Sequence, residues 1–156
     1  MMRWAYWVLA LGLALGAGFV HARSDALIVD LIDQPALQVD KSPAEAAVIK
    51  KAFLTAGTRL GWSFTEEAPD RLVGTLVVRN RHTAVVEISL RSGAFDLKYR
   101  SSVNLHARET PNAVAGNEPT PPAGARVTSG GVWTIHPSYT RWVRNLVAGV
   151  RAELGS

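Results

Sequence analysis

Two histidines and one arginine are the residues of this sequence best suited to bind an anion. Arg79 and His82 flank a predicted tight turn, and His136 directly precedes Pro137, a residue favoured at the first position of a helix. Imidazolium, guanidinium and the amides of a helix N-terminus all attract negative charge. If strand pairing brings these segments to one end of a sheet, they form a candidate anion pocket made of Arg79, His82, Tyr99, Asn104, His136 and Tyr139.

The same residues also fit a purely structural corner. Arg79 and the two histidines can bond to backbone carbonyls and so fix a helix to the sheet. We favour this interpretation, because buried polar groups must find partners whatever the protein does. The sequence leaves the choice open.

The sequence supports a catalytic site less well than an anion pocket or a structural corner. The residue types of a catalytic triad are present as Ser101, Ser102, His82, His136 and Asp96. The predicted strand register, however, places Asp96 on the face of the sheet opposite His82, and no nucleophile-elbow string is present. We therefore expect no catalytic residues.

Metal binding is not expected either. The histidines at 82, 106 and 136 lack the helical spacing of metal ligands, and the chain contains no cysteine. We expect no metal and no cofactor.

Two consecutive hairpins are predicted from Leu72 onward. With Asn80-Arg81 as the first turn, the expected pairs are Arg79 with His82, Val77 with Ala84, Thr75 with Val86 and Val73 with Ile88. With Ser92-Gly93 as the second turn, they are Leu90 with Phe95, Ile88 with Leu97 and Val86 with Tyr99. This register also sets Glu87 opposite Lys98, a favourable cross-strand pair.

The predicted register divides the apolar residues between two faces. The helix-facing set is Val73, Val77, Val86, Ile88 and Leu97. The opposite face retains Leu72, Leu76, Val78 and Val85, through which the chain is expected to meet the flexible loop or a second copy of itself.

Two amphipathic helices frame the sheet. Ser42-Pro43-Ala44-Glu45 has the form of a capping box with proline at the first helical position, and Gly61 is placed to end that helix. Its apolar stripe is Val48, Ile49, Ala52, Phe53, Ala56 and Leu60. The second helix follows Pro137, and its stripe is Tyr139, Trp142, Val143, Leu146, Val147, Val150 and Leu154.

These elements predict an α+β fold, an antiparallel sheet of about four strands with both helices packed on one face. A short strand is also expected over residues 27–32. The segment 106–131 is rich in proline and glycine and is expected to be a flexible loop that contributes little to stability. We expect residues 23–156 to form a single domain.

The first residues are typical of a secretory signal peptide. Arg3 provides the positive start, Val8 to Val20 form an uncharged apolar run, and Val20-His21-Ala22 fits a cleavage site. We expect a leader over residues 1–22. The alternative is an uncleaved anchor over Trp4 to Val20, near the lower limit of spanning length. Without cysteine there is neither lipidation nor a disulfide, so the processed protein should be periplasmic or secreted, with no stable membrane span.

The charge of the processed chain is mild. Removing Arg3 lowers the 17 Lys and Arg residues to 16, against 13 Asp and Glu, which leaves a net charge of +3. The positive residues are spread along the chain and form no nucleic-acid footprint. An envelope protein or an anionic envelope component is the expected partner.

Several short strings together resemble a group of small bacterial periplasmic proteins and lipoproteins of unassigned function. They are Gly61-Trp62, Arg79 with His82, Ser101-Ser102-Val103-Asn104-Leu105, and Ile135-His136 with Tyr139, Trp142 and Leu146. The resemblance spans about Val48 to Leu154 and implies the architecture, without an activity. This chain departs from the group in having no cysteine and a longer segment between Leu105 and Ile135.

The expected function is therefore a non-enzymatic periplasmic binding module or envelope accessory protein. The alternative is a periplasmic hydrolase or another enzyme that uses the corner of His82 and His136. The two differ in whether a nucleophile and a carboxylate accompany the histidines.

Processing can be tested directly. We expect the mature chain to begin at Arg23, because the cleavage positions precede it. Mass spectrometry of the exported protein measures this, and an exported chain that retains Met1 or Met2 would contradict the signal peptide.

Overall fold

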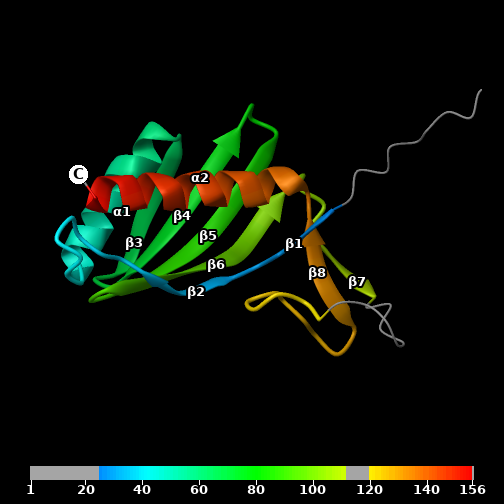
Figure 1. Ribbon diagram of the computed structural model, residues 1–156. Helices are drawn as coiled ribbons and strands as arrows, with labels where there is room; N and C mark the ends of the chain where they lie inside the picture. The colour runs from blue at the N-terminus through cyan, green and yellow to red at the C-terminus, as the bar shows by residue number, and fades with distance from the viewer. Residues whose placement is uncertain (1–24, 112–119, 156) are drawn as a thin grey trace, which may run out of the picture.

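A meander of four antiparallel strands forms the centre of the fold (Figure 1). The computed structural model describes residues 25–111 and 120–155. The meander consists of β3 (Trp62–Ala68), β4 (Arg71–Val78), β5 (His82–Arg91) and β6 (Ala94–Val103). An N-terminal strand, β2 (Leu31–Pro35), pairs with β6 and gives a five-stranded sheet of order β2-β6-β5-β4-β3.

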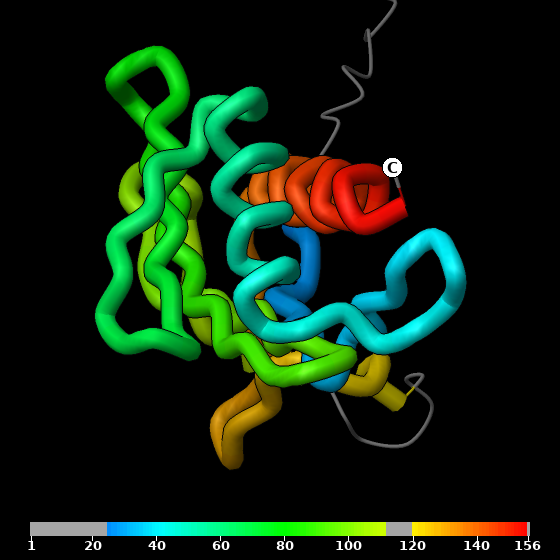
Figure 2. The backbone as a smooth tube through the Cα atoms, turned by 90° about the vertical axis from the view of Figure 1, so that its left-hand side faces the viewer, coloured from blue at the N-terminus to red at the C-terminus, as the bar shows by residue number. Residues whose placement is uncertain are grey.

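Two helices and a small second sheet complete the structure. Helices α1 (Ala46–Arg59) and α2 (Pro137–Leu154) pack on each other and lie on the same side of the large sheet (Figure 2). The small sheet has the order β1-β8-β7 and consists of β1 (Ala26–Leu27), β8 (Gly131–Ile135) and β7 (Arg108–Pro111). The α+β class is thus confirmed, whereas the strand count of about four was too low.

The hairpin of β5 and β6 has the predicted register. Leu90 pairs with Phe95, Ile88 with Leu97, and Glu87 with Lys98. A bulge then shifts the pairing between Val85 and Val86, so that Thr83 faces Val103. The predicted register, continued without a bulge, would set Val103 opposite His82, and the bulge moves it by one residue.

The hairpin of β4 and β5 differs from the prediction by one residue. Val78 pairs with His82, Leu76 with Ala84 and Leu72 with Ile88. The connection has three residues instead of two. Arg79 and Asn80 take left-handed backbone conformations, with φ of 53° and 50°, and Arg81 N donates to the carbonyl of Val78 at 3.1 Å.

This one-residue shift exchanges the two faces of β4. Leu72 and Leu76 lie in the core, with exposed fractions of 1% and 6%, whereas Val77 is 52% exposed. Val78 packs against the core as well. The predicted homo-oligomer surface of Leu72, Leu76, Val78 and Val85 therefore does not exist as an exposed patch. Placing two leucines inward, in place of Val73 and Val77, buries more apolar surface.

Phe64 lies between two glycines, one on α1 and one on β4. A Cβ at Gly57 would overlap the Phe64 ring, and a Cβ at Gly74 would lie 3.1 Å from it. Gly74 is on the helix-facing side of β4, between the buried Leu72 and Leu76. The two missing side chains therefore make the space into which the phenylalanine packs.

Helix α1 begins later than the predicted capping box. Glu45 occupies the N-cap position and makes no side-chain cap bond, while Ser42 Oγ bonds to Asp40 instead. The box fails because both backbone groups of Ala44 bond outside the helix: its amide donates to Ala36 O and its carbonyl accepts from Gly93 N.

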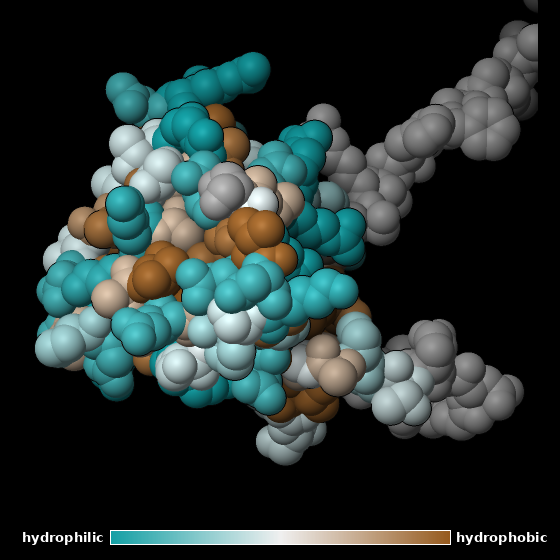
Figure 3. All heavy atoms as spheres, turned by 60° about the vertical axis from the view of Figure 1, so that its left-hand side comes forward, coloured by the Kyte–Doolittle hydropathy of each residue, from teal (hydrophilic) through white to brown (hydrophobic). Residues whose placement is uncertain are grey.

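The other helix boundaries agree with the prediction. Gly61, with φ of 85°, follows the end of α1, and Pro137 begins α2. Most of the predicted stripe of α1 is buried, but Val48 and Leu60 reach the surface. Figure 3 shows hydrophobic side chains among hydrophilic ones on the face that carries α1.

The predicted strand over residues 27–32 is divided by Asp30 into β1 and β2. The Asp30 carboxylate accepts from Tyr99 N at 2.9 Å and from Arg126 Nε at 2.9 Å. Arg126 also donates to the carbonyl of Tyr99, and its guanidinium lies 5.3 Å from the centre of the Tyr99 ring.

The segment predicted to be a flexible loop therefore includes ordered contacts. Its described parts form β7 and the start of β8, and Arg126 N donates to Ile28 O while Asp30 N donates to Gly124 O. The expectation that the segment contributes little to the fold was wrong for residues 124–126. The predicted leader and residues 112–119 lie outside the described residues.

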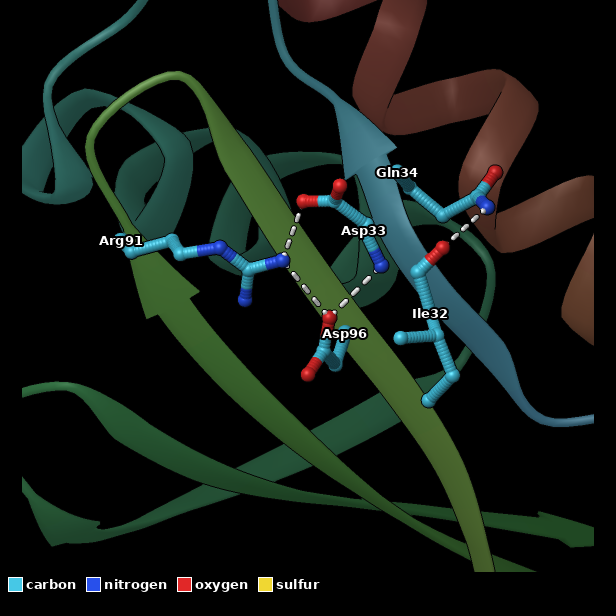
Figure 4. Close-up of polar contacts among 5 residues, drawn as sticks. All are labelled: Ile32, Asp33, Gln34, Arg91 and Asp96. Atoms are coloured by element: carbon cyan, nitrogen blue, oxygen red, sulfur yellow. Dashed lines mark hydrogen bonds and ion pairs between the residues drawn. The ribbon is translucent and has the colours of Figure 1, made fainter.

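A cluster of two carboxylates and one guanidinium holds β2 at its bulge (Figure 4). Arg91 NH2 bonds to Asp33 Oδ1 at 2.6 Å and to Asp96 Oδ1 at 3.0 Å, and Asp33 N donates to the same Asp96 oxygen. Burial acts to raise the pKa of Asp96, but the Asp33 amide and the Arg91 guanidinium outweigh it, so the pKa of this carboxyl lies below its ordinary value.

No helix in the ranges 25–111 and 120–155 has the length and apolar character needed to cross a membrane.

The contacts of Arg126 give a stability prediction. Arg126→Ala should lower the free energy of unfolding by about 1–3 kcal/mol, because the part-buried carboxylate of Asp30 loses a charged partner. Urea denaturation followed by circular dichroism measures this change. Arg108→Ala is the matched control, since its ion pair with Asp25 is more exposed. Equal effects of the two substitutions would contradict this role of Arg126.

Candidate functional site

A small pocket lies where β5 begins, β6 ends and α2 begins. Its volume is about 190 Å³. Its lining consists of His82, Asn104, Leu105, His106, His136, Ser138 and Trp142. We call it the three-histidine pocket.

The backbone around this pocket is unusually rich in left-handed residues. Among the described residues, six that are not glycine have positive φ, and four of these are at this corner: Arg79, Asn80, Asn104 and His106. Asparagine tolerates this conformation, whereas arginine and histidine adopt it at some cost. Such strain persists only where surrounding contacts hold it, and it concentrates at functional sites.

Asn104 joins the three segments of the corner. Its side-chain amide donates to Arg81 O at 2.6 Å, and its backbone carbonyl lies 2.9 Å from His82 Nδ1. The carbonyl of the next residue, Leu105, accepts from His136 N at 2.9 Å. The turn between β4 and β5, the end of β6 and the start of α2 are thereby fixed to one another.

The hydrogen bonds determine which nitrogen of each imidazole carries a proton. His82 Nδ1 faces a carbonyl oxygen, which only accepts, so this nitrogen is the donor. His136 Nδ1 caps α2 by accepting from Ser138 N at 3.2 Å, so its proton is on Nε2. In the neutral state, His82 retains an Nε2 lone pair and His136 an Nε2–H donor for further bonds.

The electrostatic surroundings of the pocket are basic. None of the seven lining residues is a carboxylate. Arg141 NH2 donates to Ser138 Oγ at 3.3 Å, and the exposed turn beside the pocket carries Arg79 and Arg81. A small anion would therefore meet donors and positive charge, without a competing negative group on the lining.

The structure brings together three of the six predicted site residues. His82, Asn104 and His136 line the pocket, whereas Arg79 is exposed in the turn and is not part of the lining. The remaining two, Tyr99 and Tyr139, form an edge-to-face pair with ring centres 5.5 Å apart, outside this lining.

Sequence reasoning missed His106, Ser138 and Trp142. His106 was considered only as a metal ligand, and Trp142 only as part of an apolar helix stripe. A signal for Ser138 was present in the string Ile135-His136-Pro137-Ser138. A histidine at the N-cap, followed by proline at the first helical position, places Ser138 on the first turn of the helix, beside His136.

The two tyrosines have different surroundings. Tyr99 OH bonds to Ser102 Oγ at 3.0 Å. Tyr139 OH is buried and, among the described residues, has no hydrogen-bond partner. Burial raises the pKa of Tyr139 far above its ordinary value, so its hydroxyl stays protonated.

The remaining triad residue types are not assembled. Asp96 belongs to the cluster with Arg91 and Asp33, and Ser102 bonds to Tyr99. Within residues 25–111 and 120–155, no three His, Cys, Asp or Glu side chains are grouped closely enough to hold a metal ion.

Comparison of the chain with models of protein families, with curated proteins and with solved structures finds no significant match. The resemblance to small periplasmic proteins stays a prediction.

Substitutions can separate the helix-capping role of His136 from any other role of its imidazole ring. His136→Ala should lower the free energy of unfolding by about 0.5–2 kcal/mol, because the amide of Ser138 loses its acceptor. His136→Asn should restore most of this loss, since the asparagine side-chain oxygen is a good N-cap acceptor. Urea denaturation compares the two. If Asn were as damaging as Ala, the histidine would stabilise the corner by something other than capping.

Proposed function

We propose that this protein is a non-catalytic binding module of the bacterial envelope whose three-histidine pocket takes a small acidic group. The observation that carries the proposal is the pair of His82 and His136, each fixed through Nδ1, on one pocket without a carboxylate. The ligand is the phosphate or carboxylate of an envelope component.

The two imidazoles would have different roles in binding an anion. His136 donates from Nε2–H while its Nδ1 continues to cap the helix. His82 keeps its bond from Nδ1 to Asn104 O, and in the imidazolium form its Nε2 is a second donor. A charge-assisted bond from His82 and a neutral bond from His136 would then hold two oxygens of one ligand.

The size of the pocket supports a small group as the ligand. A volume of about 190 Å³ lies below the usual range for complete organic ligands. It suits a single phosphate or carboxylate attached to a larger molecule that remains outside. The basic residues Arg141 and Arg81 near the rim favour such a molecule when it is acidic.

The hydrolase alternative has less support. Among the described residues, neither His82 nor His136 bonds to a carboxylate, and neither bonds to a serine hydroxyl. Both imidazoles are oriented by the backbone instead. Nucleophilic catalysis by a serine would require the base to contact the nucleophile.

Binding can be tested with inorganic phosphate and glycerol phosphate as probes. The side-chain ¹H–¹⁵N correlation spectrum of the histidines reports both tautomers, and titration should shift the signals of His82 and His136. We expect His82→Ala to weaken binding about tenfold, since a charge-assisted bond contributes at least about 1.4 kcal/mol.

Arg79→Ala is the control, because it removes a positive charge near the pocket without changing the lining. Equal weakening by the two substitutions would indicate general electrostatic attraction and contradict a defined site. An absence of histidine shifts at millimolar probe would also overturn the proposal.

A further inference from the structure

A second pocket lies beside the first half of α2. Its volume is about 290 Å³. Its lining is mainly apolar and consists of Leu27, Val29, Leu31, Pro122, Tyr139, Thr140, Val143 and Arg144. None of these residues lines the three-histidine pocket.

A more open hollow adjoins this apolar pocket. Its lining is Ala26, Pro137, Thr140, Arg141, Arg144 and Asn145. Thr140 and Arg144 belong to both linings, so the apolar pocket and the open hollow are continuous along α2. The combined site has an apolar end and a basic end.

The basic end has a free positive charge. Arg144 is exposed and has no hydrogen-bond or ion-pair partner in the part of the chain that the structure describes. Arg141, one turn earlier, bonds within the described ranges only to the neutral Ser138 hydroxyl. No carboxylate lines either hollow, so two guanidinium groups one helical turn apart are available to an acidic ligand.

The apolar end provides burial for a hydrocarbon chain. Leu27, Val29 and Leu31 are only partly buried, although they flank the fully buried Ile28. An apolar ligand would remove their remaining exposed surface from water. Tyr139, whose buried hydroxyl has no hydrogen-bond partner among the described residues, also belongs to this lining.

We infer that this combined site binds a single-chain amphiphile with an acidic headgroup. The hydrocarbon chain occupies the pocket of Leu27, Val29 and Val143, and the headgroup bonds to Arg144 and Arg141. A fatty acid and an alkyl phosphate share this chemistry. The site shares no lining residue with the three-histidine pocket, although Arg141 lies beside both, and it does not depend on the function proposed for that pocket.

The experiment uses octyl phosphate, octanoate, octanol and inorganic phosphate, each titrated into the purified protein below the critical micelle concentration. Methyl ¹H–¹³C spectra follow Leu27, Val29, Leu31 and Val143. Octyl phosphate and octanoate should both shift these signals, because both combine a chain with a charge. Octanol should bind at least about tenfold more weakly, and inorganic phosphate should leave the methyl signals unchanged.

Two substitutions test the two ends. Arg144→Gln should weaken binding of octyl phosphate about tenfold and leave octanol binding unchanged. Arg151→Gln, on the same helix and outside both linings, is the matched control and should have no effect. Leu27→Thr should weaken the acidic amphiphiles and octanol alike, because it shortens the apolar wall.

Three outcomes would overturn the inference. They are methyl shifts that begin only above the critical micelle concentration, equal effects of Arg144→Gln and Arg151→Gln, and no preference for octyl phosphate over octanol. His82→Ala should not change amphiphile binding. A failure of the three-histidine pocket can therefore be distinguished from a failure of this site.

Discussion

The packing of Phe64 between Gly57 and Gly74 sets the position of almost everything else. Any side chain at Gly57 would overlap the ring, so α1 can lie against the sheet only because that side chain is missing. A missing side chain also permits the close packing of the two helices, since a Cβ on Gly149 of α2 would lie 3.1 Å from the Cβ of Ala56 on α1. The sheet thus positions α1, and α1 positions α2. This packing places the start of α2 beside the corner that contains His82.

The polar corner and the candidate site are made by the same bonds. Asn104 satisfies the carbonyl of Arg81, and His136 satisfies an amide at the start of α2. Such bonds are structural roles, although Asn104 is exposed and His136 is only half-buried. The bonds of His82 with Asn104 O and of His136 with Ser138 N both use Nδ1 of the histidine, so they also determine the tautomers and leave Nε2 for another molecule. A structural role for these residues is therefore compatible with a binding role, and the two interpretations of the sequence need not be exclusive.

Periodicity and turn chemistry were sufficient to predict much of the fold. The Ser92-Gly93 turn and the pair of Glu87 with Lys98 determined one hairpin, because glycine with positive φ and opposite charges leave few registers. The neighbouring hairpin was wrong by one residue, because Arg79 takes a left-handed conformation that arginine rarely adopts.

Other features of the fold and the site depended on contacts between residues that are far apart in the sequence. The capping box at Ser42 failed since Ala44 bonds to Ala36 and Gly93, which no local pattern indicates. Three of the seven lining residues, His82, Asn104 and His136, were among the predicted site residues. Ser138 and Trp142 were missed, because their place in the pocket depends on how α2 docks.

The pairing of the first strand with the last has a consequence for folding. Ala26 of β1 pairs with Ile135 of β8, and α1 packs on α2, the final helix. The hairpins of β3 to β6 are local and can form early, but closure of the core requires contacts across about a hundred residues. A chain that emerges N-terminus first would therefore keep Ile28 and the residues of α1 that face α2 exposed until β8 and the last helix arrive. During that interval the protein is most vulnerable to proteolysis and aggregation.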